Sequence, residues 1–249
     1  IFIILITLLI LSVAVIKMDA LTKFDYRRKI FRYLFLTWIL VWLGWIAGGQ
    51  ITILSVLMWV VAPVNNPSWN VLLSDPLLSV LMAYVIISFI FWGRGLFCGW
   101  LCPFGSLQEL LGKFAQFIKL PQIRISEKIN KNALNIKYII LLSLVITSFY
   151  SAELLNLGSE IEPFKTSISM QFQREWYFVL YAVTLLILGL FIERFFCRFL
   201  CPLGAFMVLG GKLRFKNPLK RRAECGNPCK LCSKACPIDA IDKKGNINM

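Results

Sequence analysis

Histidine is absent from this chain of 249 residues. Imidazole is the ligand of bis-histidine haem and of many copper and iron sites, and it is the side chain that most often moves protons near neutral pH. Its absence excludes those sites and a histidine proton relay, and with them a quinol oxidase of the cytochrome b type built from this chain alone. Phosphate-binding glycine loops and the Gly-x-Ser-x-Gly nucleophile motif are also missing. The chemistry therefore has to come from other residue types.

Charged residues are scarce, at 16% of the chain, whereas hydrophobic residues make up 58% and the mean hydropathy is +0.72. A helix needs about 20 apolar residues to cross the hydrocarbon core of a bilayer. Runs near or above that length predict an integral membrane protein of the all-α class, with five spans. The second run is too long for one straight helix, and Gly44, Gly48, Gly49 and Gln50 indicate either a bend there or a second part that lies in the outer interface. The runs are residues 1–16, 33–62, 77–92, 138–152 and 176–192.

The basic residues follow the alternation expected of a membrane protein. Residues 17–32, 93–137 and 193–249 hold six, seven and twelve Lys or Arg, whereas residues 63–76 and 153–176 hold none and two. Loops rich in Lys and Arg stay in the cytoplasm. This predicts an inner-membrane protein with a periplasmic N-terminus, and with its C-terminus and all cysteines on the cytoplasmic side. It also explains the net charge of +14 without contact with nucleic acid.

The motif Cys-x3-Cys-Pro occurs twice, in the phrases "LFCGWLCPFG" and "FFCRFLCPLG". Cysteines four residues apart share one face of a helix, and a proline fits the first turn of the helix that follows. The repetition predicts an internal repeat related by a pseudo-two-fold axis, with amphipathic helices along the cytoplasmic interface after each proline. Three interpretations stay open: a shared metal or cluster site, a pair of redox-active dithiols, or small packing residues. The cysteines are Cys98, Cys102, Cys197 and Cys201.

The remaining cysteines form a run near the C-terminus that resembles a ferredoxin motif. Their spacing is Cys-x3-Cys-x2-Cys-x3-Cys-Pro, one residue longer in the first gap than the ferredoxin pattern for [4Fe–4S] clusters. A structural zinc site is the alternative. The fourth cysteine completes this cluster or serves a second one, whose motif we expect beyond residue 249. The run divides the chain into a transmembrane domain, residues 1–215, and a ferredoxin-type segment, residues 216–249. The expected ligands are Cys225, Cys229, Cys232 and Cys236.

Two further groups of charged residues allow more than one role. Arg94, Glu193 and Arg194 lie at a predicted membrane edge beside the cysteines, where they either extend towards the lipid headgroups or tune an anionic cluster. The loop of residues 153–176 carries four glutamates. It is either a solvated loop, or a surface that docks an extracytoplasmic partner or shapes a quinol pocket.

Four phrases, in this order, resemble the NosR/NirI family of membrane iron–sulfur flavoproteins over nearly the whole chain: "FWGRGLFCGWLCPFGSLQELL", "EIEPFKT", "ERFFCRFLCPLGA" and "ECGNPCKLCSKACP". NapH-like quinol dehydrogenase components share the Cys-x3-Cys-Pro pairs but match the flanking phrases less well. The resemblance implies an FMN-binding domain before the first span and a polyferredoxin after the last, so we expect this chain to be a fragment. It also implies that the C-terminal run holds clusters and that the four repeated cysteines are redox or metal residues.

The expected function is therefore electron transfer, by a component of a larger system and not by a self-contained enzyme. Electrons would pass from the quinone pool through iron–sulfur centres towards a periplasmic flavin and nitrous oxide reductase. The alternatives are a membrane redox sensor that regulates expression or maturation of that reductase, a NapH-like quinol dehydrogenase of another periplasmic reductase, and a zinc-stabilised scaffold.

Overall fold

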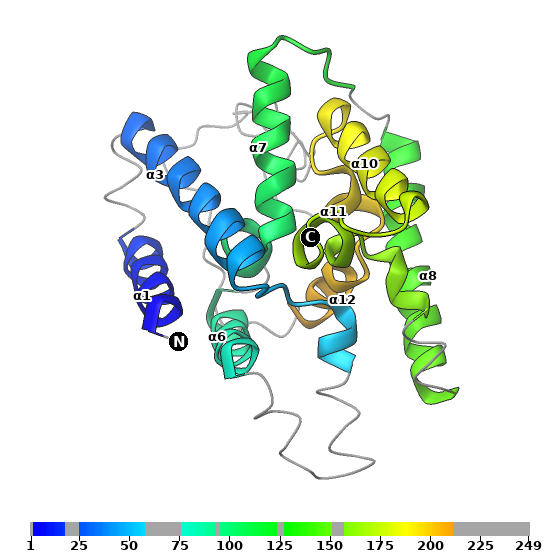
Figure 1. The fold of residues 1–249 in the computed structure, drawn as a ribbon, viewed down its shortest axis with the longest axis horizontal. Coiled ribbons are helices and arrows are strands. Elements are labelled where there is room, and N and C mark those ends of the chain that lie inside the picture. Colours follow the sequence, from blue (N-terminus) through cyan, green and yellow to red (C-terminus); the bar gives the residue numbers. More distant parts are fainter. Residues whose placement is uncertain are drawn as a thin grey trace, which may run out of the picture.

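The computed structural model describes residues 2–17, 25–57, 76–92, 95–123, 127–150 and 157–211 (Figure 1). These residues form helices and connecting loops, with no strand among them, as the predicted all-helical class requires. The helices in chain order are α1 Phe2–Ile16, α3 Asp25–Trp38, η1 Ile39–Ile46, α6 Pro76–Trp92, η2 Phe97–Leu101, α7 Pro103–Phe117, α8 Glu127–Tyr150, η3 Ser159–Ile161, η4 Lys165–Ser169, α10 Trp176–Phe191, α11 Phe195–Phe199 and α12 Pro202–Gly210. Of these, η1, η2 and η4 are π-helices and η3 is a 3₁₀-helix.

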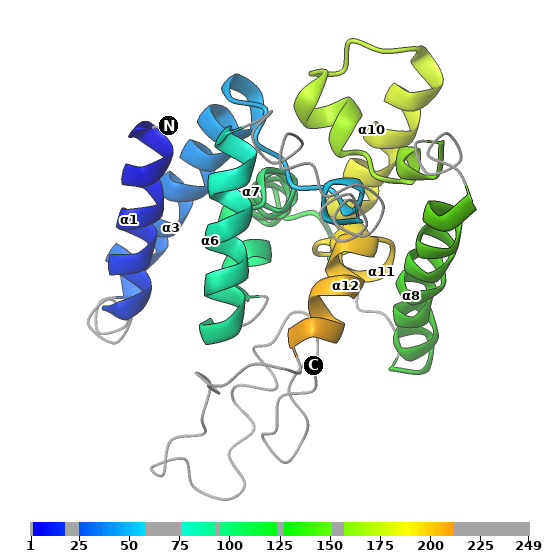
Figure 2. The ribbon, with the colours of Figure 1, turned by 90° about the horizontal axis from the view of Figure 1, so that it is seen from below.

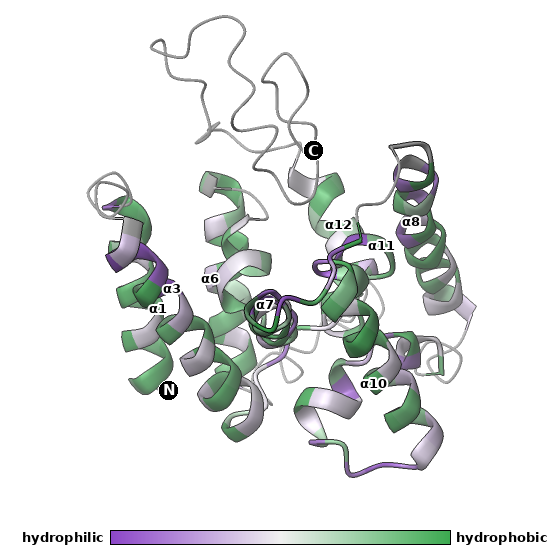
Figure 3. Ribbon diagram, turned by 90° about the horizontal axis from the view of Figure 1, so that it is seen from above, coloured by the Kyte–Doolittle hydropathy of each residue, from purple (hydrophilic) through white to green (hydrophobic). Residues whose placement is uncertain are grey.

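Apolar helices lie at the five positions where the hydropathy pattern predicts spans. Two of them, Tyr26–Ile46 and Asn132–Tyr150, are long and apolar enough to cross a membrane. Three others, Phe2–Ile16, Pro76–Phe91 and Trp176–Phe191, are apolar but shorter. Figure 3 shows apolar residues predominating along α1, α6 and α10. The number of crossings stays a prediction.

The second apolar run bends where its glycines indicate. The continuous helix α3–η1 ends at Ile46, and the N–H of Ala47 donates to the carbonyls of Trp42 and Gly44. Gly48 follows with a φ of +62°, a left-handed conformation that glycine adopts without a steric penalty. The predicted start was too late, because the helix begins at Asp25 within the polar segment.

The helix α7 lies at the centre of the described part of the chain, and not along its edge. In Figure 1 it runs between α3 and α10, and in Figure 2 it is seen end-on between α6 and α12. Both Gln108 and Glu109 on this helix are buried. The sequence predicts an amphipathic helix along the cytoplasmic interface; the polar residues Gln108 and Glu109 instead lie in the interior, where Glu109 pairs with two arginines, and the place of α7 relative to the membrane stays a prediction.

Three phenylalanines from distant segments close the core around α7. Phe104, Phe164 and Phe196 are each at most 1% exposed. Their ring centroids lie 5.0 to 5.5 Å apart, and the Phe196 ring meets the other two edge-on. Buried rings in this geometry stabilise a core beyond their apolar area. They join the two cysteine phrases and the loop that precedes α10.

Candidate functional site

The two Cys-x3-Cys-Pro phrases fold in the same way. In each, the first cysteine lies in a short helix, Cys98 in η2 and Cys197 in α11. The second cysteine is the N-cap of the next helix, with the proline at its first position, where no N–H is needed. The Cys102 sulfur accepts the N–H of Gly105 at 3.4 Å, and the Cys201 sulfur accepts that of Gly204 at 3.2 Å. Each helix thus directs a backbone N–H at a sulfur atom.

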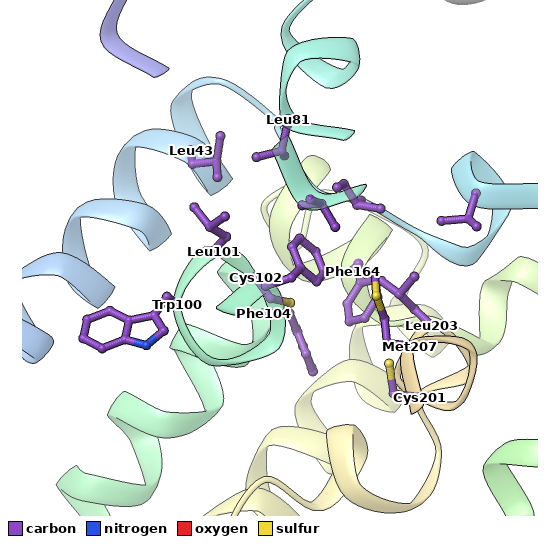
Figure 4. Close-up of a cluster of buried hydrophobic side chains, with 14 of the residues drawn as sticks. Leu43, Leu81, Trp100, Leu101, Cys102, Phe104, Phe164, Cys201, Leu203 and Met207 are labelled. Atoms are coloured by element: carbon purple, nitrogen blue, oxygen red, sulfur yellow. The ribbon is translucent and has the colours of Figure 1, made fainter. Parts of the chain in front are cut away.

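Both second cysteines are buried in one apolar cluster (Figure 4). Polar groups enter this cluster from two other segments. The Gln50 amide lies beside Cys102, with its Nε2 3.6 Å from the sulfur, and its Oε1 accepts the Phe104 N–H at 3.4 Å. Glu162 is 3% exposed and accepts the N–H of Ile53 through both carboxylate oxygens, at 3.2 and 3.3 Å. Sulfur and polar groups are therefore enclosed together, away from water.

Burial controls the charge of these groups. It raises the pKa of Glu162 to about 8, against the weaker effect of the Ile53 N–H. Burial also raises the pKa of Cys102, Cys197 and Cys201. A further cause at Cys197 and Cys201 is the negative charge that the other cysteines would carry if ionised, since all four cysteines belong to or pack against the same buried cluster. The sulfurs of Cys102, Cys197 and Cys201 are therefore protonated at neutral pH unless a metal binds them.

A buried carboxylate on α7 connects this region to two arginines. Glu109 accepts from Arg32 Nε at 2.6 Å and from Arg32 Nη2 at 2.9 Å, and it also forms an ion pair with Arg194. The Arg32 guanidinium lies over the Trp100 ring, 4.7 Å from its centroid. Burial opposes ionisation of Glu109, but the hydrogen bonds and charges of the arginines outweigh it and hold its pKa below the usual value. The carboxylate is therefore ionised.

The neighbouring residue on α7 contacts the second phrase. Gln108 is 1% exposed, and its Oε1 accepts the backbone N–H of Cys197 at 3.4 Å. Its buried Nε2 has no hydrogen-bond partner among the described residues. Gly189 on α10 lies beside this amide, and a Cβ there would lie in ordinary contact with Nε2, at 3.4 Å.

The predicted outer loop uses two of its glutamates internally. Glu160 pairs with Lys165 at 2.8 Å and with Arg174 at 2.6 Å, and Glu162 is buried. The loop is also fastened to η1, because Trp45 Nε1 donates to the Ser167 carbonyl at 3.3 Å. The carboxylates of Glu160 and Glu162 are therefore unavailable to an acidic docking surface.

The structure brings Cys98, Cys102, Cys197 and Cys201 together but does not show a ligand set for a single metal ion. In the part of the chain that is described, no three Cys, Asp or Glu side chains are placed to hold one ion. An iron–sulfur cluster needs a wider spacing of its cysteines than a single ion does, because each cysteine binds a different iron atom. Pairs of thiols in which the second sulfur receives an N–H fit that chemistry. The assignment of the four repeated cysteines to an iron–sulfur cluster stays a prediction. The other predicted ligands, Cys225, Cys229, Cys232 and Cys236, lie outside the described residues, as does Arg94.

Sequence reasoning missed the residues that support the cysteines. Gln50 belongs to no quoted phrase and was noticed only as part of a bend, whereas Gln108 and Glu109 lie within the phrase "FWGRGLFCGWLCPFGSLQELL" but were assigned no role. The available signal was a pair of polar residues, Gln108 and Glu109, inside the apolar stretch that follows Pro103. Polar residues at such positions have partners when buried.

Comparison with known proteins places these observations in a family. A family model described as "4Fe-4S binding domain" matches residues 74–121 and 176–220, and one described as "NosR" matches residues 223–249. Each of the first two segments contains one Cys-x3-Cys-Pro phrase. No solved structure matches the chain.

Three curated relatives match nearly the whole chain. "Regulatory protein NosR" of Stutzerimonas stutzeri is 42% identical over 99% of this chain and 34% of its own length. The protein of the same name from Pseudomonas aeruginosa is 44% identical over 97% of the chain and 34% of its own length. "Protein NirI" of Paracoccus denitrificans is 42% identical over 97% of the chain and 35% of its own length. The chain thus spans about a third of the length of these relatives. The cysteine motifs, their order along the chain and the extent of the matches to these relatives agree. The chain belongs to the NosR/NirI family.

Proposed function

We propose that this chain is the membrane-embedded, iron–sulfur-containing core of an electron-transfer protein of denitrification. One observation carries the proposal. The 4Fe–4S family model matches two segments, and each contains a Cys-x3-Cys-Pro phrase whose second sulfur receives a backbone N–H. Hydrogen bonds to cysteine sulfur are one of the means by which proteins set the potential of such centres.

Placement in the inner membrane is supported by two helices long enough to span it and by the uneven distribution of basic residues. In this arrangement five helices cross the bilayer, and the cysteines lie on the cytoplasmic side. The hydrocarbon core is about 30 Å thick, which is long for a single electron hop. A carrier between the cytoplasmic run of cysteines and a periplasmic flavin is therefore needed, and the four repeated cysteines or a quinone would supply it.

The residues that would hold iron–sulfur centres are the eight cysteines: Cys225, Cys229, Cys232 and Cys236 in the ferredoxin-like run, and Cys98, Cys102, Cys197 and Cys201 in the repeat. When bound, such a centre accepts and releases one electron at a time. The protein's own contribution is to exclude water around Cys102 and Cys201, to direct the Gly105 and Gly204 N–H groups at their sulfurs, and to hold Arg194 near the first cysteines.

The test uses the full-length protein, purified without oxygen. Electron paramagnetic resonance and optical spectra are recorded while a quinol is added. We expect iron–sulfur signals that the quinol reduces, and loss of one signal and of iron in Cys98→Ser and Cys201→Ser. Ser143→Ala, on an exposed face of α8, is the control for loss of iron during purification. Signals that quinol leaves unchanged would exclude quinol as the donor. Full iron content in both cysteine variants would remove the repeated cysteines from the electron path.

A sensor is the second candidate, because two of the relatives are named "Regulatory protein NosR". A sensor would be reduced once per molecule and would show no sustained electron flow to an acceptor. Steady-state quinol oxidation with an artificial acceptor separates the two functions.

A further inference from the structure

The buried group Arg32–Glu109–Arg194 joins three parts of the chain that are remote in sequence. Arg32 comes from α3, Glu109 from α7, and Arg194 from the turn before α11. The carboxylate is buried, with 8% of its side chain exposed, whereas the side chains of Arg32 and Arg194 are 30% and 23% exposed. Such a group is more than a surface ion pair, because removal of one member leaves charge in a poorly solvated place.

The backbone of Arg194 is held in a strained conformation. Its φ of 53° and ψ of 43° lie in the left-handed region, which residues with a Cβ seldom adopt. Strain of this kind persists where surrounding contacts fix it, and it is common at functional sites. At this position it allows the Arg194 side chain to reach Glu109 while the backbone begins the helix that carries Cys197.

Hydrogen bonds from this group and from the adjacent Gln108 reach the backbone of both first cysteines. Arg194 Nη1 lies 3.5 Å from the carbonyl of Cys98, and Arg32 Nη2 donates to the carbonyl of Gly99 at 3.3 Å. On the other side, Gln108 accepts the N–H of Cys197. The two phrases are thus held in register by neighbouring residues of α7, directly or through the arginines.

The group also carries an excess of positive charge. Within it, two guanidinium groups face one carboxylate. Arg194 Nη1 lies 3.5 Å from the carbonyl of Cys98, and Arg194 is also the N-cap of α11, the short helix that carries Cys197. Its positive charge therefore lies close enough to both first cysteines to stabilise negative charge there.

We infer that Arg194 is a positioning residue that holds the two cysteine phrases in register and stabilises the reduced, more negative form of a redox centre at Cys98 and Cys197. This inference rests on the proposed function. Reduction adds one electron to the centre and breaks no bond. In the experiment dithionite supplies that electron and is itself oxidised.

Potentiometric titration of the full-length protein, followed by electron paramagnetic resonance, tests the inference. Arg194→Gln removes a positive charge and should lower the midpoint potential of the signal that depends on Cys98 and Cys197, whereas Arg194→Lys should restore most of it. Glu109→Gln removes the compensating negative charge and should raise the potential. Arg174→Gln is the matched control, because Arg174 pairs with Glu160 in another part of the protein and should leave the potential unchanged.

The opposite signs separate charge from a merely structural effect, which would shift both variants in the same direction. If Glu109→Gln fails to fold, Arg194→Gln is compared with Arg194→Lys, which keeps the charge, and an equal shift in these two variants would overturn the inference. A cysteine-dependent signal with an unchanged potential in Arg194→Gln or Glu109→Gln overturns the inference and leaves the proposed function standing. If Cys98→Ser and Cys197→Ser lose no signal, no centre depends on these cysteines, which overturns the inference and leaves only the ferredoxin-like run to carry the proposed function. The absence of any iron–sulfur signal from the natural protein overturns the proposed function itself, and both results are seen before any arginine variant is measured.

Discussion

Gly105 and Gly204 occupy the same position in the two phrases but differ in the room they leave for a side chain. A Cβ at Gly105 would lie 3.1 Å from the carbonyl oxygen of Cys98, whereas one at Gly204 would lie 3.5 Å from that of Cys197. The first distance requires the backbone to move, and the second is ordinary contact. The two sites therefore form a matched pair at the scale of the single residue.

We expect Gly105→Ala to lower the free energy of unfolding by about 1–3 kcal/mol, the usual effect of overpacking. Gly204→Ala should leave it unchanged or raise it by up to about 1 kcal/mol, because the added Cβ makes only ordinary contacts and alanine favours the helix over glycine. Thermal unfolding in detergent measures both. Equal loss in the two variants would contradict the difference in spacing.

Glu162 predicts a dependence of stability on pH. Its pKa is about 8 in the folded protein, against 4.5 for an ordinary glutamate. Between these values the folded protein holds a proton that the unfolded chain has released, so stability falls as the pH rises through this range and levels off above it. The slope approaches about 1.4 kcal/mol per pH unit.

Glu162→Gln abolishes this titration and keeps an oxygen for the Ile53 N–H. Its melting temperature relative to the natural protein should therefore rise steadily with pH across that range and then become constant. Melting curves at a series of pH values provide the measurement. A constant difference between the two proteins would mean that the carboxyl group does not gain a proton on folding.

At the scale of helices, α7 is the element against which helices from both halves of the described chain pack. It packs against α3, η1 and α10, and it carries both Gln108 and Glu109. A carboxylate shared by two arginines allows a polar helix face to be buried, since each charge has a partner.

Glu109→Ala leaves two guanidinium groups without their carboxylate, and we expect it to lower the free energy of unfolding by about 3–5 kcal/mol. Lys165→Ala removes an exposed partner of Glu160 and should lower it by less than about 1 kcal/mol. Chemical denaturation of the two variants under the same conditions compares them. A similar small loss in both would show that the buried group adds little to stability.

At the scale of the whole molecule, the start of α1 and the end of α12 lie on opposite sides of the described part of the chain. In Figure 2 the N-terminal end of α1 lies at the top of the view and the C-terminal end of α12 lies at the bottom. The distribution of basic residues predicts an N-terminus outside and a C-terminus inside, and this orientation stays a prediction.

Two glutamine positions test this topology. Gln173 precedes α10 in the predicted periplasmic loop, and Gln116 lies near the end of α7 in a predicted cytoplasmic segment; both are exposed. In intact spheroplasts that make the full-length protein, an impermeant maleimide should label Gln173→Cys, and should label Gln116→Cys only after permeabilisation. Peptide mass spectrometry separates these sites from the native cysteines. Labelling of Gln116→Cys from outside would contradict the predicted orientation.

The sequence by itself determined the helical class, the positions of the apolar helices, the bend after Ile46 and the family. These features depend on local composition, on the order of motifs, or on backbone preferences such as the left-handed conformation of Gly48. The identity of the cysteines as a repeated unit was also visible, because spacing and proline position are properties of the chain.

Only the tertiary structure decided what surrounds the cysteines. Gln50, Glu109 and Glu162 are brought to the two phrases from segments up to a hundred residues away, and no local pattern marks such pairings. The central position of α7 was unpredictable for the same reason. Whether a polar side chain faces water or the interior depends on the partners that reach it, and here those partners are Arg32 and Arg194, which only the folded chain places beside it.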